Sequence, residues 1–142
     1  MNHQLEVEKS VFIGTGPTKV WQAITDPESI KKFFFGTEAI SDWVVGSSLV
    51  FRNEGDGKVF EDKGTILRSD PGACLEYSYW SGYSGLEDLP ENYSRVTYVL
   101  NQEASGTTVK IKQKGFANEQ SLAHADGGWA MVLKSLKELL EK

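Results

Sequence analysis

The fold of this chain is decided by its last residues, 117–142, which read ANEQSLAHADGGWAMVLKSLKELLEK. Apolar side chains recur along this stretch at the spacing of one helical face: Leu122, Trp129, Leu133, Leu136 and Leu140. Asn118 is a favourable N-cap, and Glu119 places negative charge in the first turn, where it suits the helix dipole. The stretch predicts one long amphipathic helix, whose apolar face must be covered by the rest of the chain.

Most of the chain before this helix reads as β-strands separated by turns. Apolar and polar residues alternate there with the period of two that is typical of a half-buried strand. The predicted strands cover Gln4–Ile13, Leu49–Arg52, Val59–Arg68, Leu75–Tyr79, Arg95–Glu103 and residues 109–114. The predicted turns lie at Gly55-Asp56-Gly57, Asp70-Pro71-Gly72 and Ser105-Gly106.

Two short helices are predicted directly after the first strand. Gly16-Pro17 opens the first helix, because proline suits the first helical position. Asp26-Pro27 ends it, because the residue before a proline avoids the α region, and Asp26 then caps a second helix from Pro27 to about Phe33. A strand, two short helices, about six strands and a long helix predict an α+β helix-grip fold. In this fold a curved antiparallel sheet wraps around the C-terminal helix, and we expect residues 1–142 to form one domain.

Composition excludes several classes of function. The net charge of −5 argues against a nucleic-acid binder, because such proteins bind phosphates through basic side chains. No apolar run approaches the ~20 residues of a membrane span, and the N-terminal MNHQLEVEKS lacks the features of a signal peptide. Cys74 is the single cysteine, so we expect an inert packed thiol and a cytoplasmic protein. Motifs for nucleotide, redox or nucleophilic chemistry are absent, and we expect no cofactor.

A series of short motifs runs along nearly the whole chain. They are Val20–Glu28, which reads VWQAITDPE, then Gly46 with Leu49 and Phe51, Gly64–Leu67, Leu75–Tyr77, Gly106–Val109, Gly115-Phe116 and Gly128-Trp129. In this order they resemble the family of activator of heat-shock protein 90 ATPase homologues, within the START-like (SRPBCC, birch-pollen-allergen) superfamily. The resemblance implies the helix-grip fold. It also implies one of the functions that this superfamily hosts, which include ligand binding, cyclase chemistry and partnership with chaperones.

Aromatic residues are the best sequence evidence for a site, since a helix gripped by a sheet tends to leave a hollow between them. Phe34 and Trp43 belong to this aromatic set. The expected ligand-binding residues are Phe33, Phe51, Phe60, Tyr77, Tyr79, Tyr98, Trp129 and Leu133. The alternative for each is a packed core position. The tyrosines favour a pocket, because buried hydroxyls need partners. Gly127-Gly128 costs about 2 kcal/mol inside a helix, so a close contact or bend is expected there.

The candidates for chemistry are few and scattered. If Phe60 and Ile66 face the helix, Asp62 points into the cavity. The favoured alternative is that the strand twists or bulges near Lys63-Gly64 and Asp62 reaches solvent. His3 and His124 lack the partners of a metal site, so neither metal ligands nor catalytic residues are expected. A lysine stripe at positions 110, 112 and 114 reads as a solvated face that discourages edge pairing, or else as a docking surface for an acidic partner. The loop Ser81–Asn92 is long enough to act as a lid.

Three functions remain open at this point. The preferred one is non-catalytic binding of a small apolar or amphipathic ligand between the last helix and the sheet. The alternative is a co-chaperone-like module that contacts heat-shock protein 90. The eukaryotic co-chaperones of the family carry an additional N-terminal domain that makes much of this contact, and 142 residues leave no room for it. The third is a cyclase- or hydrolase-type enzyme that uses a pocket carboxylate such as Asp62.

Overall fold

The computed structural model describes residues 1–55, 57–82 and 84–142, so Asp56 in the predicted Gly55-Asp56-Gly57 turn lies outside the described residues. The elements in chain order are β1 (Asn2–Ile13), α1 (Pro17–Ile24), α2 (Pro27–Phe33), β2 (Glu38–Ser41), β3 (Ser48–Gly55), β4 (Lys58–Asp70), β5 (Cys74–Ser81), a 3₁₀ turn (Pro90–Asn92), β6 (Ser94–Glu103), β7 (Gly106–Phe116) and α3 (Glu119–Leu140). This order confirms the predicted α+β helix-grip fold.

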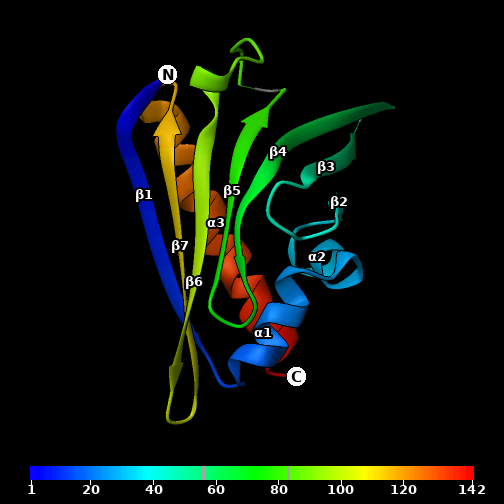
Figure 1. Cartoon of the computed structure of the whole chain (residues 1–142), viewed down its shortest axis with the longest axis vertical. Coiled ribbons are helices and arrows are strands. Elements are labelled where there is room, and N and C mark those ends of the chain that lie inside the picture. The colour runs from blue at the N-terminus through cyan, green and yellow to red at the C-terminus, as the bar shows by residue number, and fades with distance from the viewer. Residues whose placement is uncertain (56, 83) are drawn as a thin grey trace.

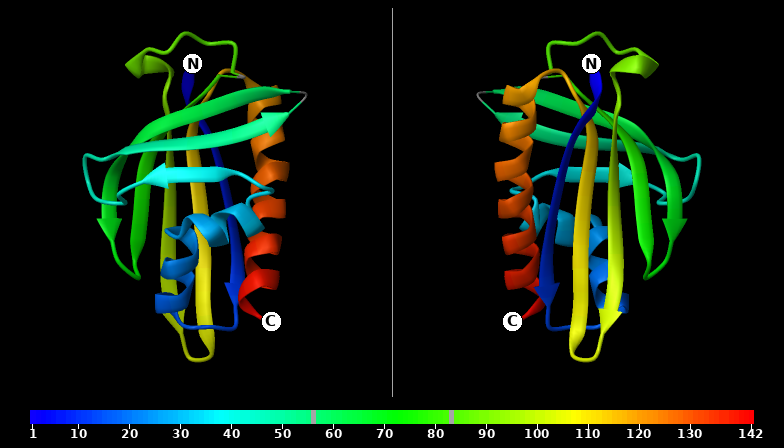
Figure 2. Two further views of the ribbon diagram at one scale, coloured as in Figure 1. Left: turned by 90° about the vertical axis from the view of Figure 1, so that its right-hand side faces the viewer. Right: turned by 90° about the vertical axis from the view of Figure 1, so that its left-hand side faces the viewer.

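Seven strands in the described part of the chain form one antiparallel sheet, in the order β1-β7-β6-β5-β4-β3-β2. The sheet curves around α3, which runs along its inner side and lies against β1, while α1 and α2 lie beside the C-terminal half of α3 (Figures 1 and 2). Because α1 and α2 lie beside the other half, the N-terminal half of α3 faces the sheet without a helix on that side.

β2 was not among the predicted strands. It has only four residues, EAIS, which is too short for a clear alternation in the sequence.

The short helices begin where the sequence predicts, for the expected physical reasons. Pro17 is the first residue of α1. Asp26 is the N-cap of α2, and its Oδ2 accepts a hydrogen bond from the backbone N–H of Ser29 at 3.1 Å. Asn118 caps α3 in the same way, since its Oδ1 accepts from the N–H of Ser121 at 2.9 Å. These caps satisfy backbone donors that a helix leaves without internal partners.

The core lies between α3 and the inner face of the sheet. Trp129, Leu133 and Leu136 are buried on the predicted stripe of α3. Opposite them, the inward residues of the central strands are buried as well: Leu75, Tyr77, Val96, Tyr98, Leu100, Val109 and Ile111. Leu122 and Leu140, nearer the two ends of α3, are partly buried against this core. The apolar face of the helix is thus buried from Trp129 to Leu136 and partly buried nearer its two ends.

The irregularity in β4 does not lie where the sequence suggested. The register between β4 and β5 shifts between Ile66 and Arg68, not near Lys63-Gly64. Gly64 instead allows a close backbone approach, because a Cβ atom there would lie 1.6 Å from the carbonyl oxygen of Ser78. The alternation of β4 therefore continues unbroken through Asp62. The favoured expectation that a bulge turns Asp62 to solvent is wrong.

The lysine stripe also has a different setting from the one expected. β7 lies between β1 and β6, so the stripe cannot protect a sheet edge. Lys110 and Lys112 instead form cross-strand ion pairs with Glu8 and Glu6 on β1, at 3.0 and 3.4 Å. These exposed pairs satisfy the two lysines locally, and each contributes little to stability. In the described part of the chain, no helix is both long and apolar enough to cross a membrane.

Candidate functional site

A large cavity of about 840 Å³ lies between the N-terminal half of α3 and the inner face of the sheet. We call it the large cavity. The helix contributes Ser121, His124, Ala125, Gly128, Trp129 and Val132 to its wall. The strands and the segment after α2 contribute Phe34, Phe35, Thr37, Phe51, Asn53, Asp62, Tyr77, Tyr79, Trp80, Ser94, Gln113 and Phe116, among others. The cavity exists because α1 and α2 cover only the other half of the sheet's inner face (Figure 2).

Aromatic rings form a continuous inner wall. Phe34 stacks on Phe51 with ring centroids 5.9 Å apart and meets the edge of Trp129 at 5.9 Å. Phe51 in turn contacts Tyr77 and Tyr79, with centroids 5.8 and 6.3 Å apart. Offset and edge-to-face contacts of this kind stabilise aromatic clusters beyond the burial of their area. The rings are therefore held in place by one another, and they present a rigid apolar surface.

The structure brings together four of the eight predicted site residues in the wall of the large cavity. These are Phe51, Tyr77, Tyr79 and Trp129. Phe33 and Tyr98 lie outside that wall, and both border a void of only about 10 Å³. Such a void is at most large enough for one water molecule. Leu133 is a core residue, and Phe60 is half-buried in β4; neither belongs to the described wall.

Phe34 lines the cavity in place of its neighbour Phe33. Phe33 is the last residue of α2 and is 2% exposed in the core, whereas Phe34 follows the helix and is half-buried. Sequence alone placed both rings near the interior, but it chose Phe33 as the ligand contact. The choice depends on the direction in which the chain leaves α2, which a run of three phenylalanines does not encode.

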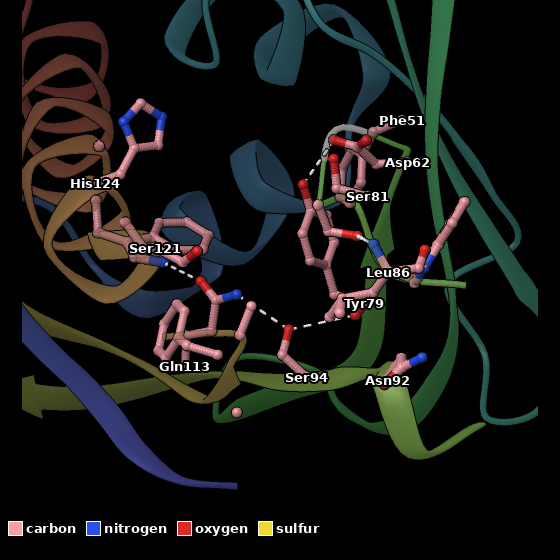
Figure 3. A pocket seen from close by; sticks show the side chains of 18 of the residues that line it. Phe51, Asp62, Tyr79, Ser81, Leu86, Asn92, Ser94, Gln113, Ser121 and His124 are labelled. Atoms are coloured by element: carbon pink, nitrogen blue, oxygen red, sulfur yellow. Dashed lines mark hydrogen bonds between the residues drawn. The ribbon is translucent and has the colours of Figure 1, made fainter. Parts of the chain in front are cut away.

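A buried relay of hydrogen bonds holds Trp129 in the cavity wall. Figure 3 shows the part of the relay formed by Gln113, Ser94 and Tyr79. The indole N–H of Trp129 donates to Gln113 Oε1 at 2.8 Å, and Gln113 Nε2 donates to Ser94 Oγ at 3.0 Å. Ser94 Oγ donates to the backbone oxygen of Tyr79 at 3.3 Å. Sequence analysis missed Gln113. Its signal is the parity of β7, because Gln113 lies on the same inward face as Ile111.

The second polar feature of the wall is a carboxylate bonded to a tyrosine. The Tyr79 hydroxyl donates to Asp62 Oδ2 at 2.6 Å, and both residues line the cavity. Burial, and then the neighbouring carboxylate, raise the pKa of Tyr79 far above its ordinary value. Asp62 is half-buried and faces the open space opposite α3 (Figure 3). The structure therefore adopts the less favoured of the two orientations weighed for Asp62.

The other two buried tyrosines, Tyr77 and Tyr98, lie side by side, with ring centroids 6.4 Å apart. Burial raises the pKa of both hydroxyl groups. Among the described residues, no buried side-chain nitrogen or oxygen lacks a hydrogen-bond partner. Tyr79 has a partner in Asp62, whereas the expectation that the Tyr77 hydroxyl is served by a wet or filled pocket stays a prediction. The case for binding depends mainly on the size and lining of the large cavity.

The mouth of the large cavity opens beside α3. It is lined by the exposed residues Gln120, His124 and Gly128. Phe35, which is 57% exposed, also lines it. A Cβ atom built on Gly127 or Gly128 would meet no atom within 4 Å. The expected close contact at these glycines is therefore not made, and α3 continues through them without a break. Gly128 faces the cavity, so the absence of a side chain there leaves the space open.

The predicted lid covers one side of the cavity. Ser81, Ser84, Leu86 and Asn92 of the loop Ser81–Asn92 line the wall, while Tyr83 lies outside the described residues. The indole N–H of Trp80 donates to the carbonyl oxygen of Leu86 at 3.2 Å, and Lys63 forms an ion pair with Asp88. These contacts tie the loop to β4 and β5. Its mobility stays a prediction.

The described geometry gives little support to catalysis by histidine, to metal binding or to a reactive thiol. His3 contacts the backbone oxygen of Glu91 at 2.8 Å, and His124 is exposed at the mouth. Within residues 1–55, 57–82 and 84–142, no three histidine, cysteine or acidic side chains gather as metal ligands do. Cys74 is buried, and its pKa is raised mainly by that burial, which disfavours the reactive thiolate.

Comparisons with known proteins agree with this architecture. The family model described as Activator of Hsp90 ATPase homolog 1-like protein matches residues 15–141. The solution structure of ChR145 from Cytophaga hutchinsonii is 39% identical in sequence and has a TM-score of 0.84, over 99% of this chain and 97% of that one. Among curated proteins, none matches the sequence.

Two further solved structures share the fold at lower identity. CalU16 from Micromonospora echinospora is 26% identical with a TM-score of 0.73, over 95% of this chain and 75% of that one. The Aha1 dimer from Colwellia psychrerythraea is 21% identical with a TM-score of 0.75, over 96% of each chain. The family match and the structure of ChR145 confirm the resemblance that the sequence motifs indicated.

Proposed function

The chain belongs to the family of Activator of Hsp90 ATPase homolog 1-like proteins, and we propose that it binds a small, largely apolar ligand in the large cavity without transforming it. The observation that carries the proposal is the cavity itself. Its volume of about 840 Å³ lies in the range of small-molecule sites, roughly 300–1,000 Å³. A solidly packed core would leave no such space.

The lining supports an aromatic or polycyclic ligand. Phe34, Phe51, Tyr77 and Trp129 present ring faces and edges that are fixed by mutual contacts. A flat apolar ligand between them gains about 25 cal/mol per Å² of apolar surface removed from water, before the costs of association. A rigid wall keeps those costs low, because few side chains must be ordered on binding. Micromolar affinity is the expected result.

Gly128 provides the sharpest test of the proposal. A leucine at this position would project into the mouth of the cavity, whereas a leucine at exposed Gly127, which is not part of the described wall, would not. Each substitution removes a helix-interior glycine and gains about 0.8–1 kcal/mol of helix propensity, so neither is expected to unfold the protein. The two variants are matched in chemistry and differ in where the side chain points.

The experiment measures the fluorescence of N-phenyl-1-naphthylamine, a neutral apolar probe, as protein is added. We expect saturable micromolar binding by the original chain and by Gly127→Leu, and a loss of about tenfold or more in Gly128→Leu, because a filled mouth excludes the probe. Melting temperatures of the three proteins serve as the folding control. Absence of saturable binding to the original chain, or equal binding by Gly128→Leu, would refute the proposal.

A co-chaperone-like role is the second candidate, and family membership is the observation that favours it. Val44 and Val45 are 58% and 64% exposed, so they offer apolar contacts to a partner protein. Titration of heat-shock protein 90 into the isotope-labelled chain tests this role by chemical-shift perturbation. Shifts around Val44 and Val45 that a Val45→Ser variant abolishes would support an interaction module. Unchanged spectra would leave ligand binding as the function to pursue.

A further inference from the structure

The described wall of the large cavity has one acidic side chain. Asp62 is the carboxylate in its described wall, and none of the described lining residues is a lysine or an arginine. Lys63, the neighbour of Asp62 in β4, has the opposite parity: its ammonium group pairs with Asp88 and lies 5.7 Å from the centre of the Trp80 ring. Two other described lining residues carry a basic group, Met1 at its α-amino group and His124 at its imidazole, and Figure 3 shows His124 across the cavity from Asp62. An anionic group placed beside Asp62 would therefore meet a carboxylate and no lysine or arginine.

Asp62 is placed as a binding group would be. Its strand partner is Phe51, and its Oδ2 accepts from the Tyr79 hydroxyl, so aromatic rings flank the carboxylate. Figure 3 shows Asp62, Tyr79 and Ser81 together on the side of the cavity that faces His124 across open space. A carboxylate has capacity for more than one donor, so the bond from Tyr79 leaves further acceptor sites on it.

This combination of groups has a clear chemical preference. A carboxylate attracts an ammonium group, and nearby ring faces add a favourable interaction with the same cation. The rest of the wall suits the apolar body of the ligand. A carboxylate on the ligand would instead be repelled, because like charges in a partly desolvated site have little screening from water.

We propose that the large cavity selects a ligand with an aromatic body and a protonated alkylamine over an aromatic or fatty carboxylate, and that Asp62 determines this selectivity. The inference rests on the proposed binding function and adds the charge class of the ligand to it. It distinguishes this site from a fatty-acid pocket, in which a basic side chain pairs with the carboxylate. The Tyr79 hydroxyl acts as a positioning group that holds the Asp62 carboxylate in the wall.

Three probes with one naphthalene ring test the charge preference by calorimetric titration at neutral pH. They are 1-naphthylmethylamine, 1-naphthalenemethanol and 1-naphthoic acid, which carry a positive, zero and negative charge. We expect the amine to bind at least about tenfold more tightly than the acid, since a charge-assisted hydrogen bond replaces a repulsion. The neutral alcohol reports binding by the cavity itself.

The variant Asp62→Asn removes the charge and keeps an oxygen that accepts from Tyr79. This variant should bind the amine about tenfold more weakly and the acid more tightly, and its affinity for the alcohol should be nearly unchanged. Glu61→Gln is the matched control, because Glu61 points to the outer face of β4 and pairs there with Arg52 at 3.7 Å. It changes the net charge equally and should leave all three affinities within about twofold.

The outcomes separate the two proposals. If the alcohol and the amine both fail to bind, the proposed function fails and the charge preference fails with it. If the alcohol binds but the acid matches the amine, or Asp62→Asn changes nothing, only the charge preference is overturned. If Asp62→Asn does not fold, the ratio of amine to acid affinity in the original chain still decides the question.

Discussion

The bond between Trp129 and Gln113 gives the most precise prediction for stability. Trp129 is 8% exposed, and its indole N–H donates to Gln113 Oε1 at 2.8 Å. In Trp129→Phe the ring still meets its neighbours Phe34 and Tyr98, whose centroids lie 5.9 and 6.0 Å from that of Trp129. The variant lacks the donor, however, so a buried amide oxygen loses its partner.

The expected cost follows from this geometry. A buried acceptor left without a partner costs about 1–3 kcal/mol, and the smaller ring adds a loss of packing. For a chain of this size, each kcal/mol lowers the melting temperature by about 3–4 °C, so the lost partner alone predicts a fall of about 3–12 °C. Trp129→Ala removes the ring as well and should cost roughly 3–5 kcal/mol.

A double-mutant cycle isolates the hydrogen bond from the packing. Urea unfolding followed by circular dichroism gives the free energy of unfolding for the original chain, Trp129→Phe, Gln113→Leu and the double variant. Gln113→Leu in the Trp129→Phe background removes the orphaned oxygen, so the double variant should be less destabilised than the two single losses summed, by about 1–2 kcal/mol. A coupling energy near zero would show that the relay behind the cavity wall does not hold Trp129.

Three further predictions concern the lid, the tyrosines and the cysteine. Amides of the loop Ser81–Asn92 should exchange faster than those of residues 95–103 in β6, because the loop has few apolar anchors; equally slow exchange would contradict a lid. Burial raises the pKa of Tyr77 and Tyr98 above the ordinary value of 10.0. As the pH rises above about 10, these tyrosines therefore ionise in the unfolded chain before they ionise in the folded protein, and the folded protein loses stability. Urea midpoints measured from pH 9 to 12 should therefore fall with rising pH, and less so in Tyr77→Phe; tyrosine ionisation near pH 10 in the folded protein, seen by absorbance, would contradict this. Cys74 should react slowly with Ellman's reagent until the protein unfolds, since its thiol is buried and its pKa is raised; rapid labelling of the native protein would show that the thiol is accessible.

The alternation of the strands predicted the orientation of the polar site residues only in part. The parity of β4 allowed Asp62 to point inward, but the sequence favoured a bulge that would turn it outward. In the structure the register shift lies between Ile66 and Arg68, and the backbone at Gly64 closely approaches Ser78. Gln113 shares the inward parity of Ile111, yet a glutamine between two lysines does not reveal that Trp129 lies opposite it.

Local sequence patterns were enough to predict the helices, every strand except β2 and the layer arrangement. Asp26-Pro27, Asn118 and the stripe of α3 set the helix boundaries and the buried face, because caps and periodicity are local or depend on a single element. The same information predicted that rings would gather between the helix and the sheet.

Which of those rings enclose space and which fill it depends on how the helices and the sheet pack together. Phe33 lies in the core and Phe34 lies in the cavity wall, although they are neighbours in the chain. The difference depends on where α2 meets α3 and on how far the sheet curves away from the N-terminal half of the helix. Those are relations between segments distant in sequence, and burial, unlike helix capping, is a property of all of them together.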